Sequence, residues 1–382
     1  MIPYGRQDIN QQDIDAVVAV LQSDWLTQGP AVPRFESAVA MHCGVPHAIA
    51  VNSATSALHL ACLALGLGPG DTLWTSPNTF VASANCARYC GAEVDFVDID
   101  PRTYNMSTEA LAAKLARAAQ EKRLPKIVVP VAFAGQSCDL RGIRALADHY
   151  GFAIIEDASH AIGAQYLGKP VGCSDHADIT VFSFHPVKII TTGEGGMALT
   201  RDDTLAQRMR LLRSHGITRE ADEMQGTSEG PWYYQQVALG FNYRMTDMQA
   251  ALGASQMTRL EPFVDQRLAL AARYDALLQD LPLITPFQSP DGRSAMHLYP
   301  VVLQDVSRRR GVFEYLRAVG IGVNVHYIPV HTQPYYRALG FRQGDFPNAE
   351  AYYAGAISLP LYPGLHEDQQ DFVVQTLREA MA

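Results

Sequence analysis

Short apolar runs alternate with helical stretches through the first two thirds of the chain, and this alternation limits the possible folds more than any other feature. Strands are expected at 47–51, 71–75, 93–97, 127–133, 154–155 and 179–182. Helices are expected between them, at 56–65, 79–89, 111–119 and 140–150. Apolar strands separated by helices are typical of a mostly parallel sheet with helices on both faces. The predicted fold class is therefore α/β, although Pro130 would interrupt one ladder of hydrogen bonds.

The pattern changes after about residue 246. The next stretch, 246–279, has a helical pattern that Pro262 is expected to interrupt. It is followed by a strand at 297–303, a helix at 306–318, a strand at 323–327 and a last helix at 367–380. A chain of 382 residues is too long for one ordinary core. We therefore expect a large domain over 1–250 and a smaller α+β domain over 251–382.

The composition excludes several classes of protein. With 48% hydrophobic and 18% charged residues, the chain is globular rather than disordered. Its net charge of −9 argues against a nucleic-acid or anionic-membrane surface. No apolar run approaches the ~18 residues of a membrane span, and the first residues lack a signal peptide, so we expect a cytoplasmic location.

The six cysteines are scattered. Cys86 and Cys90 are spaced to share a helix face and could hold a metal, but two small buried side chains are the commoner outcome. No second pair with metal-ligand spacing accompanies them. No metal site is predicted.

Lys188 lies just after the apolar run 179–182 and just before a turn rich in glycine, which includes Gly193, Gly195 and Gly196. A lysine is ordinarily a solvated surface charge. Here the apolar run favours burial, and the glycines permit a close approach of backbone to ligand. The pattern suits an amine of lowered pKa that forms a Schiff base.

Asp157 ends another apolar run, 152–156. The common role of such a residue is to cap the following helix, yet a carboxylate at the end of a buried strand is costly unless it is paired. A carboxylate and a lysine at neighbouring strand ends are what pyridoxal phosphate requires, one for the ring nitrogen and one for the aldehyde. His160, three residues further on, could meet the same cofactor.

A phosphate site is indicated by the small, hydroxyl-rich turn at 52–57, between a strand and a helix. A helix start offers unpaired N–H groups to an anion, although serine and threonine there are usually plain N-caps. Ser183, five residues before Lys188, could add a hydroxyl to the same anion.

Three further segments carry less specific signals. Phe80 could stack on a cofactor ring or simply fill the core. Residues 240–244 combine an amide and a guanidinium, which suit phosphate, but a plain polar loop would look the same. The run 326–336 is dense in hydrogen-bonding aromatic residues, which suit a sugar or nucleotide or, alternatively, a domain interface.

Taken in this order, the segments resemble the DegT/DnrJ family of sugar-modifying aminotransferases. The resemblance rests on 25–30, 52–57, 76–80, 156–160, 183–196, 240–244 and 326–336, and so spans essentially the whole chain. It implies a fold-type I pyridoxal-phosphate-dependent transferase. It implies that Lys188 is the Schiff-base lysine, that Asp157 is the ring-nitrogen partner and that His160 lies by the ring. It also implies that Ala54, Thr55 and Ser183 bind the phosphate, and that Phe80 belongs to the cofactor site.

The resemblance implies a homodimer as well, because the residue matching Asn242 reaches the cofactor phosphate of the neighbouring subunit in this family. Within the family, 26–29, 185–196 and 213–216 are most similar to the C4 aminotransferases of pseudaminic acid biosynthesis. The implied substrates are L-glutamate and UDP-2-acetamido-2,6-dideoxy-β-L-arabino-hexos-4-ulose. Thr27, Gln28, His326 and Tyr327 are the implied substrate-binding residues. The alternatives are another nucleotide-linked keto sugar, aminated at C3 or C4, and a non-catalytic ligand sensor.

Overall fold

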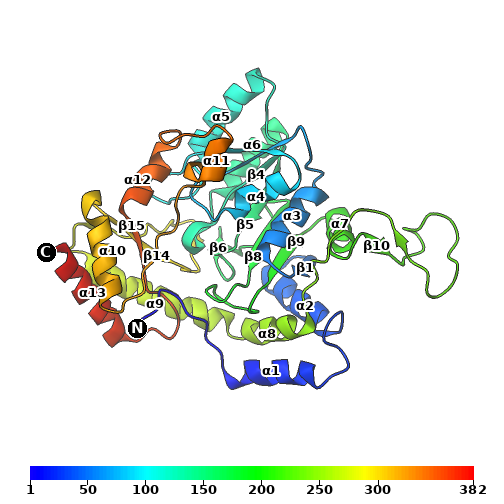
Figure 1. Ribbon diagram of the computed structural model, residues 1–382, viewed down its shortest axis with the longest axis horizontal. Helices are drawn as coiled ribbons and strands as arrows, with labels where there is room; N and C mark the ends of the chain where they lie inside the picture. The colour runs from blue at the N-terminus through cyan, green and yellow to red at the C-terminus, as the bar shows by residue number, and fades with distance from the viewer.

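A seven-stranded sheet forms the centre of the computed structural model, which describes residues 1–382 (Figure 1). Its strands, in spatial order, are β1 (His47–Val51), β9 (Gly196–Thr200), β8 (Ile179–Ser183), β5 (Ala153–Asp157), β4 (Ile127–Val129), β2 (Thr72–Thr75) and β3 (Glu93–Phe96). All neighbours are parallel except β9, which runs antiparallel to both β1 and β8. The predicted mostly parallel sheet is confirmed. β9 was not predicted, and β4 ends at Val129 because Pro130 has no N–H to continue the ladder.

Helices bury both faces of this sheet, as β1 illustrates. Ala48 and Ala50 belong to one hydrophobic core, and Ile49 and Val51 belong to another on the opposite face. The helices of this part of the chain are α2 (Ala31–Cys43), α3 (Ala54–Ala64), α4 (Ala82–Tyr89), α5 (Thr108–Gln120), α6 (Leu140–Tyr150) and α7 (Asp203–Arg213). The near-continuous apolar strands seen in the sequence are explained by this two-sided burial.

The C-terminal part has a smaller antiparallel sheet of its own, with β12 (Leu283–Ile284), β14 (Tyr299–Leu303) and β15 (Ala356–Leu359) in that order. Its helices are α10 (Arg309–Ala318), α11 (Pro334–Ala338), α12 (Pro347–Gly355) and α13 (Glu367–Met381). The expected strand at 323–327 does not form. Its pairing is limited to a single bridge between Asn324 and Ser358. The division into domains near residue 250, which falls within α8 (Asp247–Met257), stays a prediction.

The helical stretch after residue 246 breaks earlier than expected. α8 ends at Met257 and α9 (Leu260–Leu278) begins three residues later, so Pro262 lies in the first turn of α9. A first-turn proline costs no hydrogen bond, because the N–H groups there have no partner within the helix. The expectation of a break at Pro262 was therefore wrong.

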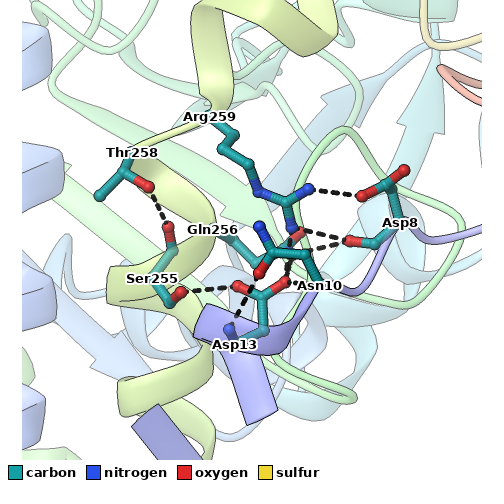
Figure 2. Close-up of polar contacts among 7 residues, drawn as sticks. All are labelled: Asp8, Asn10, Asp13, Ser255, Gln256, Thr258 and Arg259. Atoms are coloured by element: carbon teal, nitrogen blue, oxygen red, sulfur yellow. Dashed lines mark hydrogen bonds and ion pairs between the residues drawn. The ribbon is translucent and has the colours of Figure 1, made fainter. Parts of the chain in front are cut away.

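A buried polar cluster lies at this break and ties down the N-terminal segment (Figure 2). Asp13, in α1 (Gln11–Leu21), has no exposed surface. Its carboxylate accepts hydrogen bonds from Ser255 at 2.6 Å and Gln256 at 2.7 Å, and it pairs with Arg259 at 2.5 Å. Arg259 also pairs with Asp8 at 2.5 Å. The cluster fixes the N-terminal segment to the junction of α8 and α9.

An arm formed by β10 (Ile217–Thr218) and β11 (Gln235–Gln236) projects from the body of the molecule (Figure 1). Trp232 and Leu239 on this arm are 71% and 81% exposed, which is unusual for side chains so apolar. The remaining strands, β6 (Gln165–Tyr166), β7 (Lys169–Pro170) and β13 (Gly292–Arg293), form a small separate sheet. None of the helices has the length and apolar character that crossing a membrane requires.

Candidate active site

A cavity of about 550 Å³ opens where β5 and β8 end and α3 begins. Carboxyl ends of strands are where open α/β sheets usually bind ligands. The predicted site residues that line the cavity are Ala54, Thr55, Phe80, Asp157, His160, Ser183, Lys188, His326 and Tyr327. The irregular segment 324–327, from the C-terminal part of the chain, forms another part of its wall.

Asp157 is buried at the end of β5 and faces this cavity. One of its carboxylate oxygens accepts from the Ser83 hydroxyl at 2.6 Å. The other accepts from the Ser159 hydroxyl at 2.6 Å and from the Ser159 N–H at 3.1 Å. Asp157 forms no ion pair, so these neutral donors hold a negative charge that has no counter-ion in the protein. A protonated ring nitrogen would supply one.

Lys188 lies in the turn after β8 and reaches the same cavity. Removal from water lowers the pKa of its amine to about 8, with the Asp157 carboxylate acting in the opposite direction. The amine has no hydrogen-bond partner in the protein. A half-buried amine that is unpaired and easily deprotonated is suited to attack a carbonyl carbon.

The first turn of α3 offers an anion site. Its N-cap, Ser53, accepts from the Ser56 N–H at 3.1 Å, which leaves the N–H groups of Ala54 and Thr55 without intrahelical partners. Gly196 lies directly against this turn, and a Cβ atom there would collide with the Ala54 nitrogen and the Ser53 carbonyl. Ser183, at the end of β8, pairs with Gly196 in the sheet and brings its hydroxyl to the cavity wall.

Four histidines line the cavity, and the three buried ones, His160, His297 and His326, are kept neutral by burial. The pKa values of His160 and His297 lie well below the usual range, and that of His326 falls to about 3, with the Lys188 charge adding to the effect of burial in each case. His160 Nδ1 accepts from the Ala134 N–H at 3.3 Å, and its Nε2 lies 3.0 Å from the Tyr327 hydroxyl. His160 and Tyr327 are thereby held together at the inner wall.

Thr27, Gln28 and Asn242 lie outside the cavity. All three are exposed. Thr27 bridges Thr246, the N-cap of α8, and the backbone carbonyl of Asn242 is 3.5 Å from the Asn52 amide nitrogen. Within one chain these three side chains do not join the residues that line the cavity.

Four polar residues of the site received no role from the sequence. Ser159 was the most accessible to prediction, because a hydroxyl two residues after an aspartate is well placed to bond it. Ser83 reaches Asp157 from α4, 74 residues away in the chain, and no local pattern signals that contact. Asn324 and His297 lie in segments that were expected to be strands. The hydrophobic pattern of a strand does not indicate which of its polar side chains faces a cavity.

The residues of the cavity fit pyridoxal phosphate. The free N–H groups at the start of α3 suit the phosphate. The Asp157 carboxylate, which has no counter-ion, suits the ring nitrogen, and the unpaired Lys188 amine suits the aldehyde. Phe80, which is 59% exposed and lines the cavity, offers an aromatic face near Tyr327, with ring centroids 6.3 Å apart.

Comparison with known proteins agrees with this geometry. Residues 7–378 match the DegT/DnrJ/EryC1/StrS aminotransferase family. The spore coat polysaccharide biosynthesis protein SpsC of Bacillus subtilis is 42% identical, over 99% of this chain and 96% of that protein. The UDP-4-amino-4,6-dideoxy-N-acetyl-beta-L-altrosamine transaminase of Campylobacter jejuni is 38% identical, over 99% of this chain and 96% of that protein.

The solved structures give the same result. PseC of Helicobacter pylori, an aminotransferase involved in the biosynthesis of pseudoaminic acid, superposes with a TM-score of 0.90 at 30% identity, over 100% of this chain and 99% of that one. Solved relatives of this fold include a form carrying pyridoxal phosphate. The chain thus belongs to the DegT/DnrJ/EryC1/StrS family of sugar aminotransferases, and its cofactor is pyridoxal phosphate.

Proposed function

We propose that this aminotransferase moves the amino group of L-glutamate to C4 of a UDP-linked 4-keto-6-deoxy-N-acetylhexosamine, UDP-2-acetamido-2,6-dideoxy-β-L-arabino-hexos-4-ulose. The product would serve pseudaminic acid biosynthesis. The observation that carries the general reaction is the unpaired Lys188 amine in one cavity with the unpaired Asp157 carboxylate. The specific sugar is supported by whole-length similarity to the transaminase of Campylobacter jejuni and to PseC.

The cofactor would be held by residues from four segments of the chain. The N–H groups of Ala54 and Thr55 and the Ser183 hydroxyl would bind its phosphate. Asp157, fixed by Ser83 and Ser159, would keep its ring nitrogen protonated. Phe80 and His160 would contact the ring, and Lys188 would bond to the aldehyde carbon. These assignments follow from which groups face the cavity.

Pyridoxal phosphate, when bound, supplies an aldehyde that exchanges amines and a ring that accepts an electron pair. Lys188 supplies the proton transfers. Because its pKa is lowered to about 8, a substantial fraction of the free amine is neutral near pH 7 to 8. Its Nζ would take the α proton of glutamate in the first half-reaction and deliver a proton to C4 of the sugar in the second. The neutral histidines around it add no positive charge to oppose its own protonation.

A homodimer with shared sites would complete the binding surface. Asn242 is exposed and lies outside the cavity of its own chain, as expected of a residue that serves a neighbour. Thr27 and Gln28 are exposed in the same way. The apolar side chains on the β10–β11 arm, Trp232 and Leu239 among them, would be buried by a second copy.

A different nucleotide-linked keto sugar is the second candidate. It is favoured by the higher identity to SpsC, 42% against 38%, because SpsC is a protein of spore coat polysaccharide biosynthesis. The two candidates share the reaction and the cofactor, and differ in the sugar that accepts the amino group.

Absorbance spectroscopy of the purified holoenzyme separates these possibilities. Glutamate should convert the pyridoxal form to the pyridoxamine form, and the UDP-linked 4-keto sugar should reverse the change. Conversion without reversal would keep the aminotransferase and remove the proposed sugar. No conversion by glutamate would remove glutamate as donor. Lys188→Ala should bind cofactor but show neither change, and turnover by that variant would overturn the role of Lys188.

A further inference from the structure

Two hydrogen-bond donors without an acceptor in the protein, one on Tyr327 and one on His297, lie beside His160 in the cavity. His160 cannot donate to a ligand, because its Nδ1 accepts from the Ala134 N–H and its single ring hydrogen is therefore on Nε2, directed at the Tyr327 hydroxyl at 3.0 Å. Tyr327 receives that bond, so its own O–H hydrogen is free. Tyr327 lines the cavity, and burial raises its pKa, which keeps the phenol protonated.

His297 supplies the second donor. Its ring packs on His160 with centroids 4.4 Å apart, and only 4% of the residue is exposed. Nδ1 is fully buried without a partner, whereas Nε2 makes no hydrogen bond and keeps accessible surface. A buried N–H without an acceptor is rarer than an unused lone pair. The hydrogen is therefore on Nε2, where it faces the cavity.

His326, the third histidine, has no free donor. Its Nε2 lies 3.3 Å from the Asn324 amide nitrogen and accepts from it, so its Nδ1–H donates to Ser358 at 2.8 Å. Of the three buried histidines, only His297 has an N–H left for a ligand.

The backbone of His297 is held at both ends, so this donor is fixed in place. The His297 N–H donates to the Ala134 carbonyl at 2.8 Å. Its carbonyl accepts from Arg267 at 3.3 Å. Arg267 is 1% exposed, pairs with no carboxylate, and donates instead to the carbonyls of Met296, His297 and Leu361. A buried arginine committed to backbone carbonyls is a positioning residue for the segment that carries His297.

We propose that the Tyr327 O–H and the His297 Nε2–H together bind one carboxylate of the amino donor, an inference that rests on the proposed function. A carboxylate has two oxygens that can accept from two donors at once. Within one chain no arginine lines the cavity, and Lys188 is committed to the chemistry, so these two neutral donors are available to receive the acid. The keto sugar has no carboxylate, so these donors distinguish the amino donor from the sugar.

Glutarate is the probe, because it is a dicarboxylate that has no amino group and cannot react. Its Kd for the holoenzyme is measured by calorimetry for wild type, His297→Leu, His297→Gln and Tyr327→Phe. His149→Leu, an exposed histidine of α6, is the matched control. Loss of a hydrogen bond to a charged group should raise Kd about ten- to hundredfold in His297→Leu and Tyr327→Phe. His297→Gln, which keeps an N–H donor, should recover part of the loss.

The half-reaction with the keto sugar provides the second measurement. In His297→Leu, the KM for the keto sugar should stay near the wild-type value. Unchanged glutarate binding, or an equal loss for glutarate and the sugar, would overturn the carboxylate site. Tyr327→Phe keeps the ring and its packing, so the test stands even if His297→Leu folds poorly. If glutarate binding depends on His297 but glutamate produces no conversion in wild type, the proposed function fails and the carboxylate site remains.

Discussion

Lys188 and Asp157 face the same cavity without forming an ion pair. The hydroxyls of Ser83 and Ser159 occupy the carboxylate oxygens of Asp157, and the amine of Lys188 is left with no partner. An ion pair would stabilise the protonated amine and raise its pKa. Keeping the two groups apart preserves a nucleophilic amine and an available negative charge in one site.

Cofactor uptake should therefore follow the deprotonation of Lys188. The neutral amine attacks the aldehyde, and its pKa is lowered to about 8. Below pH 8 the rate of covalent incorporation into cofactor-free protein should rise about tenfold per pH unit, and above pH 8 it should level off. Stopped-flow absorbance measures this rate. A rate that keeps rising beyond pH 10 would indicate an ordinary solvated lysine.

Asp157→Asn should slow the glutamate half-reaction about a hundredfold or more, because a neutral amide cannot stabilise a positive ring nitrogen in a buried site. The amide is nearly the same size, and the Ser83 and Ser159 hydroxyls can rotate to bond it. Affinity for inorganic phosphate at the α3 start should therefore persist. Asp305→Asn, at an exposed carboxylate, is the control. A half-reaction rate equal to that of this control would contradict the role of Asp157.

Functional residues at strand ends were easier to predict from the sequence than residues whose contacts join segments far apart in the chain. The positions of Asp157 and Lys188 at the cavity could be predicted, because each follows an apolar run typical of a buried strand. Ser83 could not, because its contact with Asp157 depends on how α4 packs against β5. The segment 323–327 looked like a strand from its composition, yet it is irregular and lines the cavity. β9 was not predicted, because it follows β8 after a turn and runs antiparallel to it, whereas the predicted pattern was one of strands separated by helices.

Gly196→Ala should weaken cofactor binding, because the added methyl group would press on the Ser53–Ala54 backbone that forms the phosphate site. Overpacking of this kind costs about 1–3 kcal/mol, which corresponds to about 5- to 150-fold in Kd if the phosphate turn takes the strain. Fluorescence titration with pyridoxal phosphate measures the change. Gly311→Ala in α10 is the control, because open space surrounds that position and alanine favours a helix. Equal cofactor affinity in the two variants would refute the proposed phosphate turn.

Arg259→Leu should destabilise the protein strongly, because it leaves the Asp13 carboxylate buried without its cation. Asp13 has no exposed surface, and breaking one half of such a pair costs about 3–5 kcal/mol. The exposed pair of Arg310 and Glu314 gives a matched control, because solvent screens it and Arg310→Leu should leave the stability nearly unchanged. Denaturation midpoints of both variants measure the difference.

A second substitution identifies the cause of that loss. Adding Asp13→Asn to Arg259→Leu removes the unpaired charge, so the double variant should regain much of the lost stability. The side-chain amide oxygen introduced by this substitution would still accept from Ser255 or Gln256, which now bond the carboxylate. If the double variant is less stable than Arg259→Leu alone, the arginine acts through its packing on Phe263, 4.7 Å from the ring centroid, and not through the charge of Asp13.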